Sequence, residues 1–256
     1  MGFTPIYPLI FPRELLRGVD DGSEERINPD STVLSEEQQS VHDEVFKAVS
    51  EKNAGVFLLH GVTGSGKTSV FEKLIHNTVR LGRRAMLLIP EIGLTPQVLK
   101  RFRALFGERV AVIHSGLSLG QRLDEYKRIK RGDADIIIGT RSAVFAPADN
   151  IGLIIIDEEG ERSYKSDSSP RYHAHDVAKQ RCAYHGATLL LASATPSIES
   201  YYLAERGVYR LLEMKNRYNS ASLPDVSIVD MNLERISGNP TEFSQQLIDE
   251  VNSNLK

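Results

Sequence analysis

A glycine-rich stretch that ends in lysine and threonine carries the clearest chemistry in this sequence. Residues 61–68 spell Gly-Val-Thr-Gly-Ser-Gly-Lys-Thr and follow the apolar run Val56–Leu59. This is the pattern G-x-x-x-x-G-K-T in the strand–loop–helix setting of a phosphate-binding loop. The glycines let the backbone curl until successive N–H groups point at one anion, and the following helix adds its positive N-terminus. The stretch therefore predicts a site for the phosphates of a nucleotide.

The side chains of this loop have separate expected tasks. Lys67 can reach the outer phosphates, and the Thr68 hydroxyl can ligate Mg²⁺. The predicted nucleotide-binding residues of the loop are Gly61, Val62, Thr63, Gly64, Ser65, Gly66, Lys67 and Thr68.

A cluster of carboxylates follows a second apolar run, Ile154–Ile156. Asp157, at the end of that run, can hold Mg²⁺ through its water shell, and Glu158 is placed to orient or deprotonate an attacking water. Acidic residues at a strand end can also form a solvated loop, but the pairing with a phosphate-binding loop favours a hydrolysis site. We therefore predict Lys67, Asp157 and Glu158 as catalytic, with Thr68 and Asp157 as Mg²⁺ ligands. The pair Asp157 and Glu158 also favours hydrolysis over the alternative hypothesis of a nucleotide kinase, which transfers phosphate to a second substrate.

Alternating apolar and helical segments position these motifs. The expected strands are 56–59, 85–89, 110–113, 135–138, 153–156 and 188–192, and the expected helices lie near 67–81, 94–106, 118–131 and 173–185. Ser35, with Gln38 three residues later, predicts a capped helix that runs to about Ser50. Short apolar runs between helices are typical of strands buried on both faces, so we expect an α/β fold with a mostly parallel sheet.

The two ends of the chain follow a different pattern. Residues 1–33 are proline-rich and then acidic, which predicts a connecting segment before a nucleotide-binding domain at 34–212. Beyond Pro196, we expect helices near 197–206 and 241–254 and strands at 209–213 and 226–229. Residues 213–256 are too few to bury a core of their own, which predicts a connector and the incomplete start of a second domain.

Composition excludes several classes of protein. The 256 residues are 41% hydrophobic and 25% charged, with a net charge of −3, so any nucleic-acid binding must come from local patches. The single cysteine, Cys182, cannot form an internal disulfide or a cysteine zinc cluster, and it fits the reducing cytoplasm. No apolar stretch approaches the roughly 18–20 residues of a membrane span, so we expect no membrane contact.

Further segments at predicted strand ends carry a resemblance to a known family. They are Pro90–Gln97 (PEIGLTPQ), His114–Leu117 (HSGL), Gly139–Pro147 (GTRSAVFAP), Ser163–Asp176 (SYK…RYHAHD) and Ser193–Ser197 (SATPS). Their order, together with the two nucleotide motifs, resembles the superfamily 2 helicases. The residues of these segments are similar to those of the PriA (primosomal protein N′) family of bacterial replication-restart helicases. The resemblance covers about residues 34–231.

The resemblance implies a three-layer, RecA-like P-loop NTPase lobe followed by the start of a second lobe. It implies ATP and Mg²⁺ as ligands, hydrolysis of ATP, and movement 3′-to-5′ along single-stranded or forked DNA. Other primosome proteins and single-stranded-DNA-binding protein are the implied partners. In this family the second lobe supplies an arginine finger, so the chain alone is expected to have weak or no activity. Zinc is expected in the full-length family, but its cysteines are absent here.

The resemblance also assigns roles to individual residues. Gln38 resembles the glutamine that reads adenine, and Ser193 and Thr195 would couple nucleotide state to DNA binding. Residues expected along the path of single-stranded DNA are Thr95, Gln97, Thr140 and Arg141. The loop 160–173 resembles an aromatic-rich loop that links DNA occupancy to hydrolysis, with Tyr164, Lys165, Arg171, Tyr172 and His173 mixing stacking surfaces and cations. A solvated loop with partly buried tyrosines is the alternative.

The chain departs from the family at two positions. Gly160 stands where the family usually has histidine, which puts tight coupling between DNA and ATP in question, and Pro170 stands where some members have an aromatic residue. A rival hypothesis is a nucleotide-binding docking module of the primosome that does no unwinding of its own. Glu158 separates the two hypotheses, because only hydrolysis needs it.

Overall fold

The computed structural model describes residues 26–218 and 226–255 of the chain. The chain divides into two compact units, Met1–Asn219 and Ser220–Lys256. Most of the predicted connecting segment 1–33 lies outside the described residues. Residues 26–34 are described, and they contain the short 3-10 helix η1 (Pro29–Ser31).

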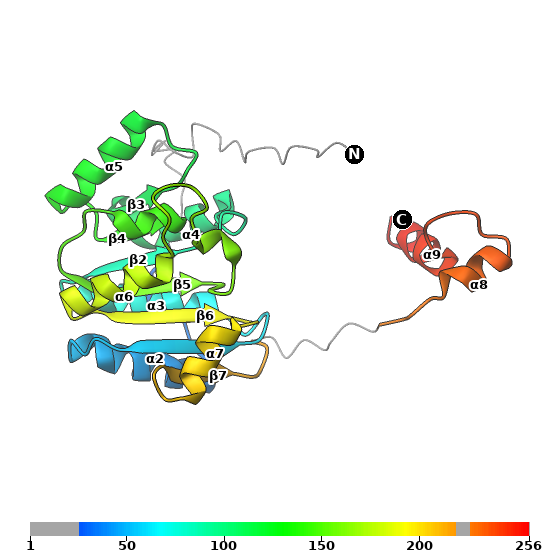
Figure 1. The fold of residues 1–256 in the computed structure, drawn as a ribbon, viewed down its shortest axis with the longest axis horizontal. Helices are drawn as coiled ribbons and strands as arrows, with labels where there is room; N and C mark the ends of the chain where they lie inside the picture. The colour runs from blue at the N-terminus through cyan, green and yellow to red at the C-terminus, as the bar shows by residue number, and fades with distance from the viewer. Residues whose placement is uncertain (1–25, 219–225, 256) are drawn as a thin grey trace. The chain divides into compact units, whose positions relative to one another are not determined.

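The first unit is built on a seven-stranded sheet in which every strand pair is parallel (Figure 1). The strand order is β3-β4-β2-β5-β6-β1-β7. The strands are β1 (Val56–Gly61), β2 (Arg84–Leu88), β3 (Val110–Ile113), β4 (Ile136–Gly139), β5 (Ile151–Asp157), β6 (Thr188–Ser193) and β7 (Arg210–Met214). The α/β class and the parallel sheet expected from the sequence are confirmed.

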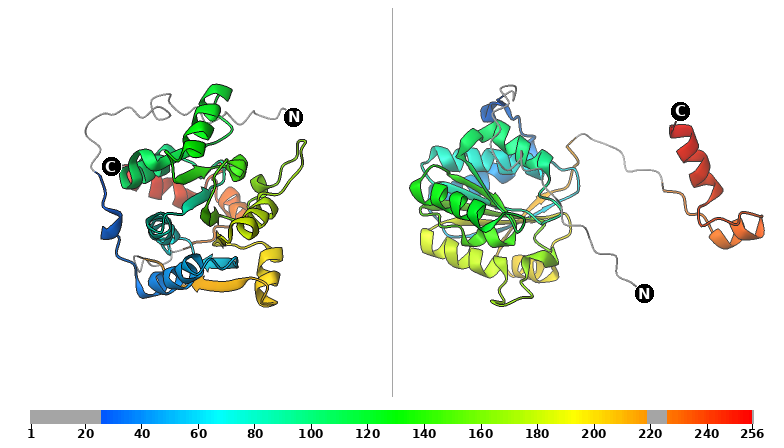
Figure 2. Two further views of the ribbon diagram at one scale, coloured as in Figure 1. Left: turned by 90° about the vertical axis from the view of Figure 1, so that its left-hand side faces the viewer. Right: turned by 90° about the horizontal axis from the view of Figure 1, so that it is seen from above.

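Helices cover both faces of this sheet and make three layers (Figure 2). One face packs against α2 (Glu36–Ser50), α3 (Lys67–Arg80) and α4 (Pro96–Phe106), and the other against α5 (Leu119–Arg131), α6 (Ala174–His185) and α7 (Ile198–Glu205). Alternate residues of each strand serve opposite cores, as Leu59 and Leu58 of β1 do. The apolar strand runs are therefore buried on both sides, as predicted.

The predicted capping of α2 is present. The Ser35 side chain accepts a hydrogen bond from the Gln38 N–H, and the Gln38 side chain accepts one from the Ser35 N–H. Val41, Val45 and Val49 then face the core along one side of the helix. The remaining predicted helices of this unit also begin and end within about two residues of the observed ones, because local caps and apolar periodicity set them.

Two expectations for the C-terminal part are wrong. The predicted domain boundary after residue 212 falls inside β7, whose Glu213 and Met214 pair with His60 and Gly61 of β1. Residues 226–229 form no strand, because no neighbouring strand in the described part of the chain pairs with them. Short apolar runs become strands only where a partner supplies hydrogen bonds.

The second unit contains α8 (Met231–Ile236) and α9 (Gln245–Asn254). None of residues 226–255 is buried, and Leu233, Leu247 and Val251 are exposed. This agrees with the expectation that so short a segment cannot bury its own core. The predicted helix near 241–254 is confirmed as α9.

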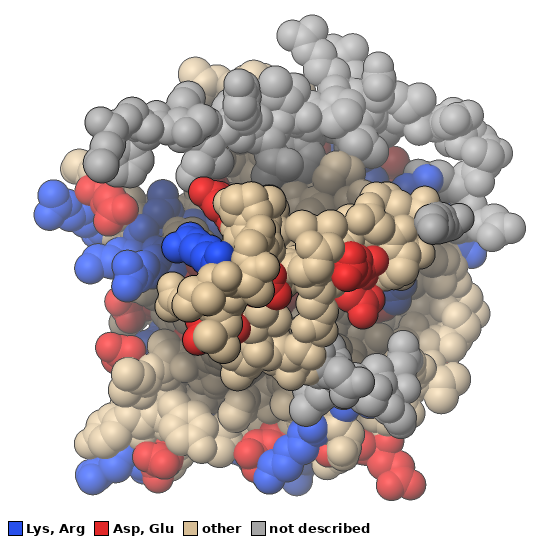
Figure 3. All heavy atoms as spheres, turned by 90° about the vertical axis from the view of Figure 1, so that its right-hand side faces the viewer, with Lys and Arg blue, Asp and Glu red and all other residues tan. Residues whose placement is uncertain are grey.

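Basic and acidic side chains both occur on the face drawn in Figure 3, and neither sign covers the whole of it. Among the described residues, no helix has the length and apolar character needed to cross a membrane.

Candidate nucleotide and nucleic-acid site

The carboxyl ends of neighbouring strands bring the predicted motifs to one edge of the sheet. The phosphate-binding loop follows β1, Pro90–Gln97 follows β2, Thr140 follows β4, Asp157 ends β5, and Ser193 ends β6. These strands stand next to one another in the order β4-β2-β5-β6-β1. Ligands of open α/β sheets bind at this edge, so the topology assembles one site from segments far apart in the sequence.

The phosphate-binding loop has the expected backbone. Gly64 and Gly66 have φ of 80° and 81°, in the left-handed region that favours glycine. A Cβ at Gly66 would also lie 2.3 Å from the Gln38 Nε2. The helix α3 begins at Lys67, directly after the loop. The buried Ser65 hydroxyl has no hydrogen-bond partner in the described part of the chain, as suits a group that awaits an anion.

Lys67 and Glu158 meet across this loop. The Lys67 Nζ donates to the Gly61 carbonyl at 2.9 Å and lies 3.7 Å from Glu158 Oε1. The other carboxylate oxygen of Glu158 accepts a hydrogen bond of 2.8 Å from the Ser193 hydroxyl. Glu158 also has φ of 45°, a strained backbone for a residue with a side chain. The fold thus holds this carboxylate firmly between a cation and a hydroxyl.

Asp157 lies deeper than Glu158. Its Oδ1 accepts a hydrogen bond of 3.0 Å from the Glu158 N–H. Burial, helped by the neighbouring Glu158 charge and opposed by Lys67, raises the pKa of Asp157 to about 6. A buried carboxylate with so little compensation favours a cation beside it. Asp157, the Thr68 hydroxyl and the free Ser65 hydroxyl therefore fit a nucleotide with Mg²⁺.

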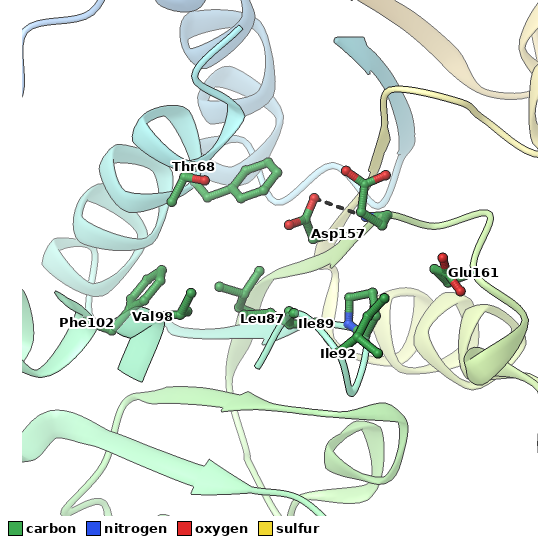
Figure 4. Close-up of a pocket in the computed structure, with 12 residues that line it drawn as sticks. Thr68, Leu87, Ile89, Ile92, Val98, Phe102, Asp157 and Glu161 are labelled. Atoms are coloured by element: carbon green, nitrogen blue, oxygen red, sulfur yellow. Dashed lines mark hydrogen bonds between the residues drawn. The ribbon is translucent and has the colours of Figure 1, made fainter. Parts of the chain in front are cut away.

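A cavity of about 270 Å³ opens beside these groups (Figure 4). Thr68 and Asp157 face each other across one end of it, and the rest of its wall is largely apolar. The apolar lining comes from α3, β2, α4 and the loop between β2 and α4, with Phe71, Leu87, Ile89, Ile92, Val98 and Phe102. Asp157 therefore has apolar residues close to it, which agrees with burial as the main cause of its raised pKa.

Gln38 is buried beside the phosphate-binding loop, with 1% of its surface exposed. Its Oε1 accepts from the Ser35 N–H at 2.9 Å, and its Nε2 donates to the Ser65 carbonyl at 2.8 Å. The amide therefore connects the cap of α2 to the loop. Its adenine-reading role stays a prediction, and contact with adenine would require one of these hydrogen bonds to be exchanged.

Glu159 has a structural role that the sequence did not indicate. Its buried carboxylate accepts hydrogen bonds from the Ser197 N–H at 2.6 Å and the Ser200 hydroxyl at 2.8 Å. Ser197 is the N-cap of α7, so Glu159 secures the start of that helix. A Cβ at the neighbouring Gly160 would lie 3.1 Å from the Thr195 carbonyl. The three acidic residues 157–159 thus divide into two at the nucleotide site and one at a helix cap.

The stacking role predicted for Tyr164 is wrong, because its ring is completely buried. Its hydroxyl donates to the Asp157 carbonyl at 2.7 Å and approaches the Leu88 carbonyl at 3.1 Å. Leu88 and Asp157 end β2 and β5, which are neighbours in the sheet. Tyr164 therefore anchors the loop to the two strand ends that shape the carboxylate site.

We expect Tyr164→Phe to lower the free energy of unfolding by about 1–3 kcal/mol, because buried carbonyl oxygens lose their partner while the ring packing stays. The measurement is urea unfolding followed by circular dichroism. Tyr184→Phe is the matched control, since Tyr184 is 87% exposed. Equal stability of the two variants would contradict the anchoring role of the Tyr164 hydroxyl.

The residues expected along the DNA path differ in their exposure. Thr140 is only 3% exposed, and its place on the DNA path stays a prediction. Arg141 donates to the carbonyls of Ser163 and Lys165 and lies over the Tyr172 ring, 5.7 Å from its centroid. Arg141 thus ties its own loop to the aromatic-rich loop.

Other predicted positions are placed but not tested. The Thr95 hydroxyl caps α4 by accepting from the Val98 N–H at 3.4 Å, and His173 caps α6. Ser193 is buried against Glu158, which suits a coupling role. Four predicted residues are exposed, namely Gln97, Lys165, Arg171 and Thr195. Their DNA contacts stay predictions.

His175 should make the protein sensitive to acid. Burial, together with the smaller effects of the His173 and Lys179 charges and against an opposing Asp176, lowers the pKa of His175 to about 3. The unfolded chain protonates this ring near pH 6.5, whereas the folded chain does not. The free energy of unfolding should therefore fall as the pH drops from about 6.5 to 3, by about 1.4 kcal/mol per unit from this group. In urea unfolding, His175→Gln should lack this contribution to the pH dependence of the free energy of unfolding. If the free-energy difference between the wild type and His175→Gln were the same at every pH, the prediction would be contradicted.

In the described part of the chain, no group of three or more His, Cys, Asp or Glu side chains could hold a metal ion. Cys182 is buried, and burial raises its pKa to about 12. Mg²⁺ usually keeps several waters and is held by one or two protein groups plus phosphates, which the pair Thr68 and Asp157 can satisfy.

Comparison with known proteins agrees with this geometry. The DEAD/DEAH box helicase family matches residues 39–203. The replication restart protein PriA of Bacillus subtilis (strain 168) is 46% identical over 222 residues, covering 87% of this chain and 28% of the relative. PriA of Synechocystis sp. is 47% identical over 195 residues, covering 74% of this chain and 24% of the relative. The chain therefore spans about a quarter of the length of these relatives.

A solved structure shares the fold. The structure of RecG bound to a three-way DNA junction is 20% identical, with a TM-score of 0.50, over 72% of this chain and 24% of that one. At this identity the likeness extends to the arrangement of strands and helices alone.

Proposed function

The chain belongs to the DEAD/DEAH box helicase family, and we propose from this that it is the ATP-binding motor lobe of a PriA-type replication-restart helicase. The observation that carries the proposal is the position of Glu158. Its carboxylate sits between Lys67 and Ser193, at the mouth of a phosphate-binding loop. A docking module that used the nucleotide only as a ligand would not need a strained, doubly held carboxylate there.

The residues divide the work of ATP hydrolysis. The curled loop from Gly61 to Thr68 binds the phosphates through its N–H groups, and Lys67 exchanges the Gly61 carbonyl for the outer phosphates. Thr68 and Asp157 would hold Mg²⁺, which neutralises charge on the phosphates when bound. Glu158 orients the attacking water and accepts its proton.

Ser193 and Tyr164 link this site to the surface. Ser193 contacts the Glu158 carboxylate and begins the loop that carries Thr195. Tyr164 contacts the Asp157 carbonyl and belongs to the aromatic-rich loop. We propose that single-stranded DNA crosses the exposed residues of these loops and that its binding moves Asp157 and Glu158 into place.

The whole protein's activity follows as part of the same proposal. We propose that it moves 3′-to-5′ on forked DNA in the bacterial cytoplasm, with other primosome proteins and single-stranded-DNA-binding protein as partners. A second RecA-like lobe would close over the nucleotide, as closure completes many catalytic sites.

The test compares this chain with a protein extended to the length of its relatives. ATP binding, oligonucleotide binding and ATPase rate are measured for both, with and without single-stranded DNA. We expect both to bind ATP–Mg²⁺ and DNA, and the extended protein to hydrolyse ATP faster by up to about 10³–10⁵, the usual effect of an arginine finger. Failure of this chain to bind nucleotide, or strong DNA-stimulated turnover by this chain alone, would contradict the proposal.

A further inference from the structure

Phe145 presents an aromatic ring to solvent from an otherwise buried turn. Its side chain is 50% exposed, whereas its neighbours Val144 and Ala146 are 0% and 1% exposed. It ends the 3-10 helix η3 (Arg141–Phe145) that follows β4. A single exposed apolar residue needs no explanation by itself, so the surroundings of the ring decide its meaning.

The backbone around Phe145 is held rigidly. Arg181 of α6 donates to the carbonyls of Val144 at 2.6 Å, Ala146 at 2.8 Å and Ala148 at 2.9 Å. One planar guanidinium therefore fixes carbonyls on both sides of Phe145, in a geometry that lysine could not copy. A ring fixed in this way loses little conformational entropy when a ligand covers it.

The ring of Phe145 packs against another aromatic ring. Tyr172 packs against it edge-on, with ring centroids 4.8 Å apart and an angle of 75° between the rings. Arg141 lies over the other ring of the pair, Tyr172, at 5.7 Å. Arg141 and Phe145 come from the turn after β4, whereas Tyr172 comes from the aromatic-rich loop. Two separate segments thus build one surface of two rings and a guanidinium.

Positive charge lies on the same loop as Tyr172. Lys165 and Arg171 are exposed, and the loop is closed by a hydrogen bond of 2.8 Å from the Ser166 N–H to the Tyr172 carbonyl. Flat apolar rings with cations beside them match a nucleobase and its phosphates. A purely apolar protein partner would gain nothing from these cations.

We propose that Phe145, with Tyr172 and Arg141 beside it, is a base-stacking platform for single-stranded nucleic acid. The proposal rests on the proposed function and adds to it a residue outside the predicted DNA path. Phe145 stacks on a base, Tyr172 supports its ring, and Arg141 fixes Tyr172. Because stacking reads no base edge, the platform accepts any sequence.

The absence of tryptophan from the chain permits a direct test. In the Phe145→Trp variant, the indole is the only one present, and its fluorescence should be quenched when an oligothymidylate stacks on it. Tyr184→Trp is the matched control, because Tyr184 is exposed near the C-terminal end of α6, whereas Tyr172 precedes the N-terminal end of that helix. We expect quenching in the first variant, with the midpoint given by fluorescence anisotropy of the labelled oligonucleotide, and none in the second.

The affinity of truncation variants gives a second measurement. Phe145→Ala should weaken oligothymidylate binding by about 5- to 150-fold, the usual value of one stacked base. Phe145→Leu keeps apolar bulk and should also weaken binding, so it serves if the alanine variant folds poorly. The dependence of affinity on salt should stay unchanged, because no phosphate contact is removed. ATP binding should be equal in all variants.

The outcomes separate the platform from the wider function. If the wild-type chain binds the oligonucleotide but the variants bind equally well and the indole is not quenched, the platform is overturned while the motor-lobe proposal stands. If the wild-type chain binds no oligonucleotide even at low salt, the platform and the proposed DNA binding both fail. Quenching together with weaker binding by Phe145→Leu supports the platform.

Discussion

Lys67→Ala should lower the affinity of the chain for ATP–Mg²⁺ by about 150- to 5,000-fold, because loss of a buried charged partner costs about 3–5 kcal/mol. The Lys67 side chain is 11% exposed, and its Nζ lies between the Gly61 carbonyl and the Glu158 carboxylate. Without it, the phosphates and the carboxylates of Asp157 and Glu158 lose the ammonium that lies between the Gly61 carbonyl and Glu158. Isothermal titration of ATP–Mg²⁺ measures the change.

Lys73→Ala is the matched control for this experiment. Lys73 belongs to the same helix, α3, but its Nζ lies 3.8 Å from Asp30, at the N-terminal segment of the described chain. The control should bind ATP as the wild type does, since a surface pair is worth little. Unchanged ATP affinity in Lys67→Ala would refute the phosphate-binding assignment, and an equal loss in both variants would point to a general effect on α3.

The elements and the phosphate-binding loop could be predicted because local sequence determines them. Ser35 and Gln38 are three residues apart and cap a helix whichever domain contains it. Gly64 and Gly66 occupy left-handed positions that a short motif specifies. Strand burial on both faces followed from runs such as Ile154–Ile156, which have no polar side to expose.

The burial of Tyr164 could not be predicted from the polar loop around it. Tyr164 and Tyr172 both lie in one polar loop, yet Tyr164 is buried under β2 and β5 while Tyr172 stays near the surface. The difference depends on β2 and β5 being neighbours in the sheet although β3 and β4 lie between them in the sequence. The local sequence around a tyrosine does not indicate which strands are neighbours in the sheet.

Long-range polar contacts were missed for the same reason. Arg181 holds carbonyls about 35 residues earlier in the chain. Glu159 caps a helix that begins 39 residues later, at Ile198. The tandem of Ser197 and Ser200 was a weak signal for that cap, since Ser197 is a favourable N-cap residue. The sequence alone did not indicate that its second partner would be a buried carboxylate.

The hydrogen bonds of Ser193 and Tyr164 connect the nucleotide site to the candidate nucleic-acid surface by two routes. One runs from Glu158 through Ser193 to Thr195, and the other from Asp157 through Tyr164 to the aromatic-rich loop. Each route ends on one of the two carboxylates. A ligand at the surface could therefore change the geometry of Asp157, the proposed Mg²⁺ ligand, or of Glu158, the proposed base. The two routes make separate predictions, because only the first passes through Glu158.

Glu158→Gln should reduce the ATPase rate by about 10²–10⁴, the usual contribution of a general base, while ATP–Mg²⁺ affinity changes little. Glutamine keeps the size of the side chain and an oxygen that can accept from the Ser193 hydroxyl, but it cannot take a proton from water. The measurement is steady-state ATPase at saturating single-stranded DNA, in the protein extended to the length of its relatives, with ATP affinity measured alongside.

Glu161→Gln is the control, because Glu161 lines the same cavity but is exposed at its rim. It should hydrolyse ATP at a rate close to that of the wild type. A normal rate in Glu158→Gln would overturn the role of Glu158 as the base. No turnover in either the wild type or the variant would favour a docking module that uses ATP only as a ligand. A slow ATPase rate in Glu158→Gln with normal ATP affinity would support a role for Glu158 in the hydrolysis step. If Glu158 only helped to bind ATP, the variant would differ from Glu161→Gln in affinity.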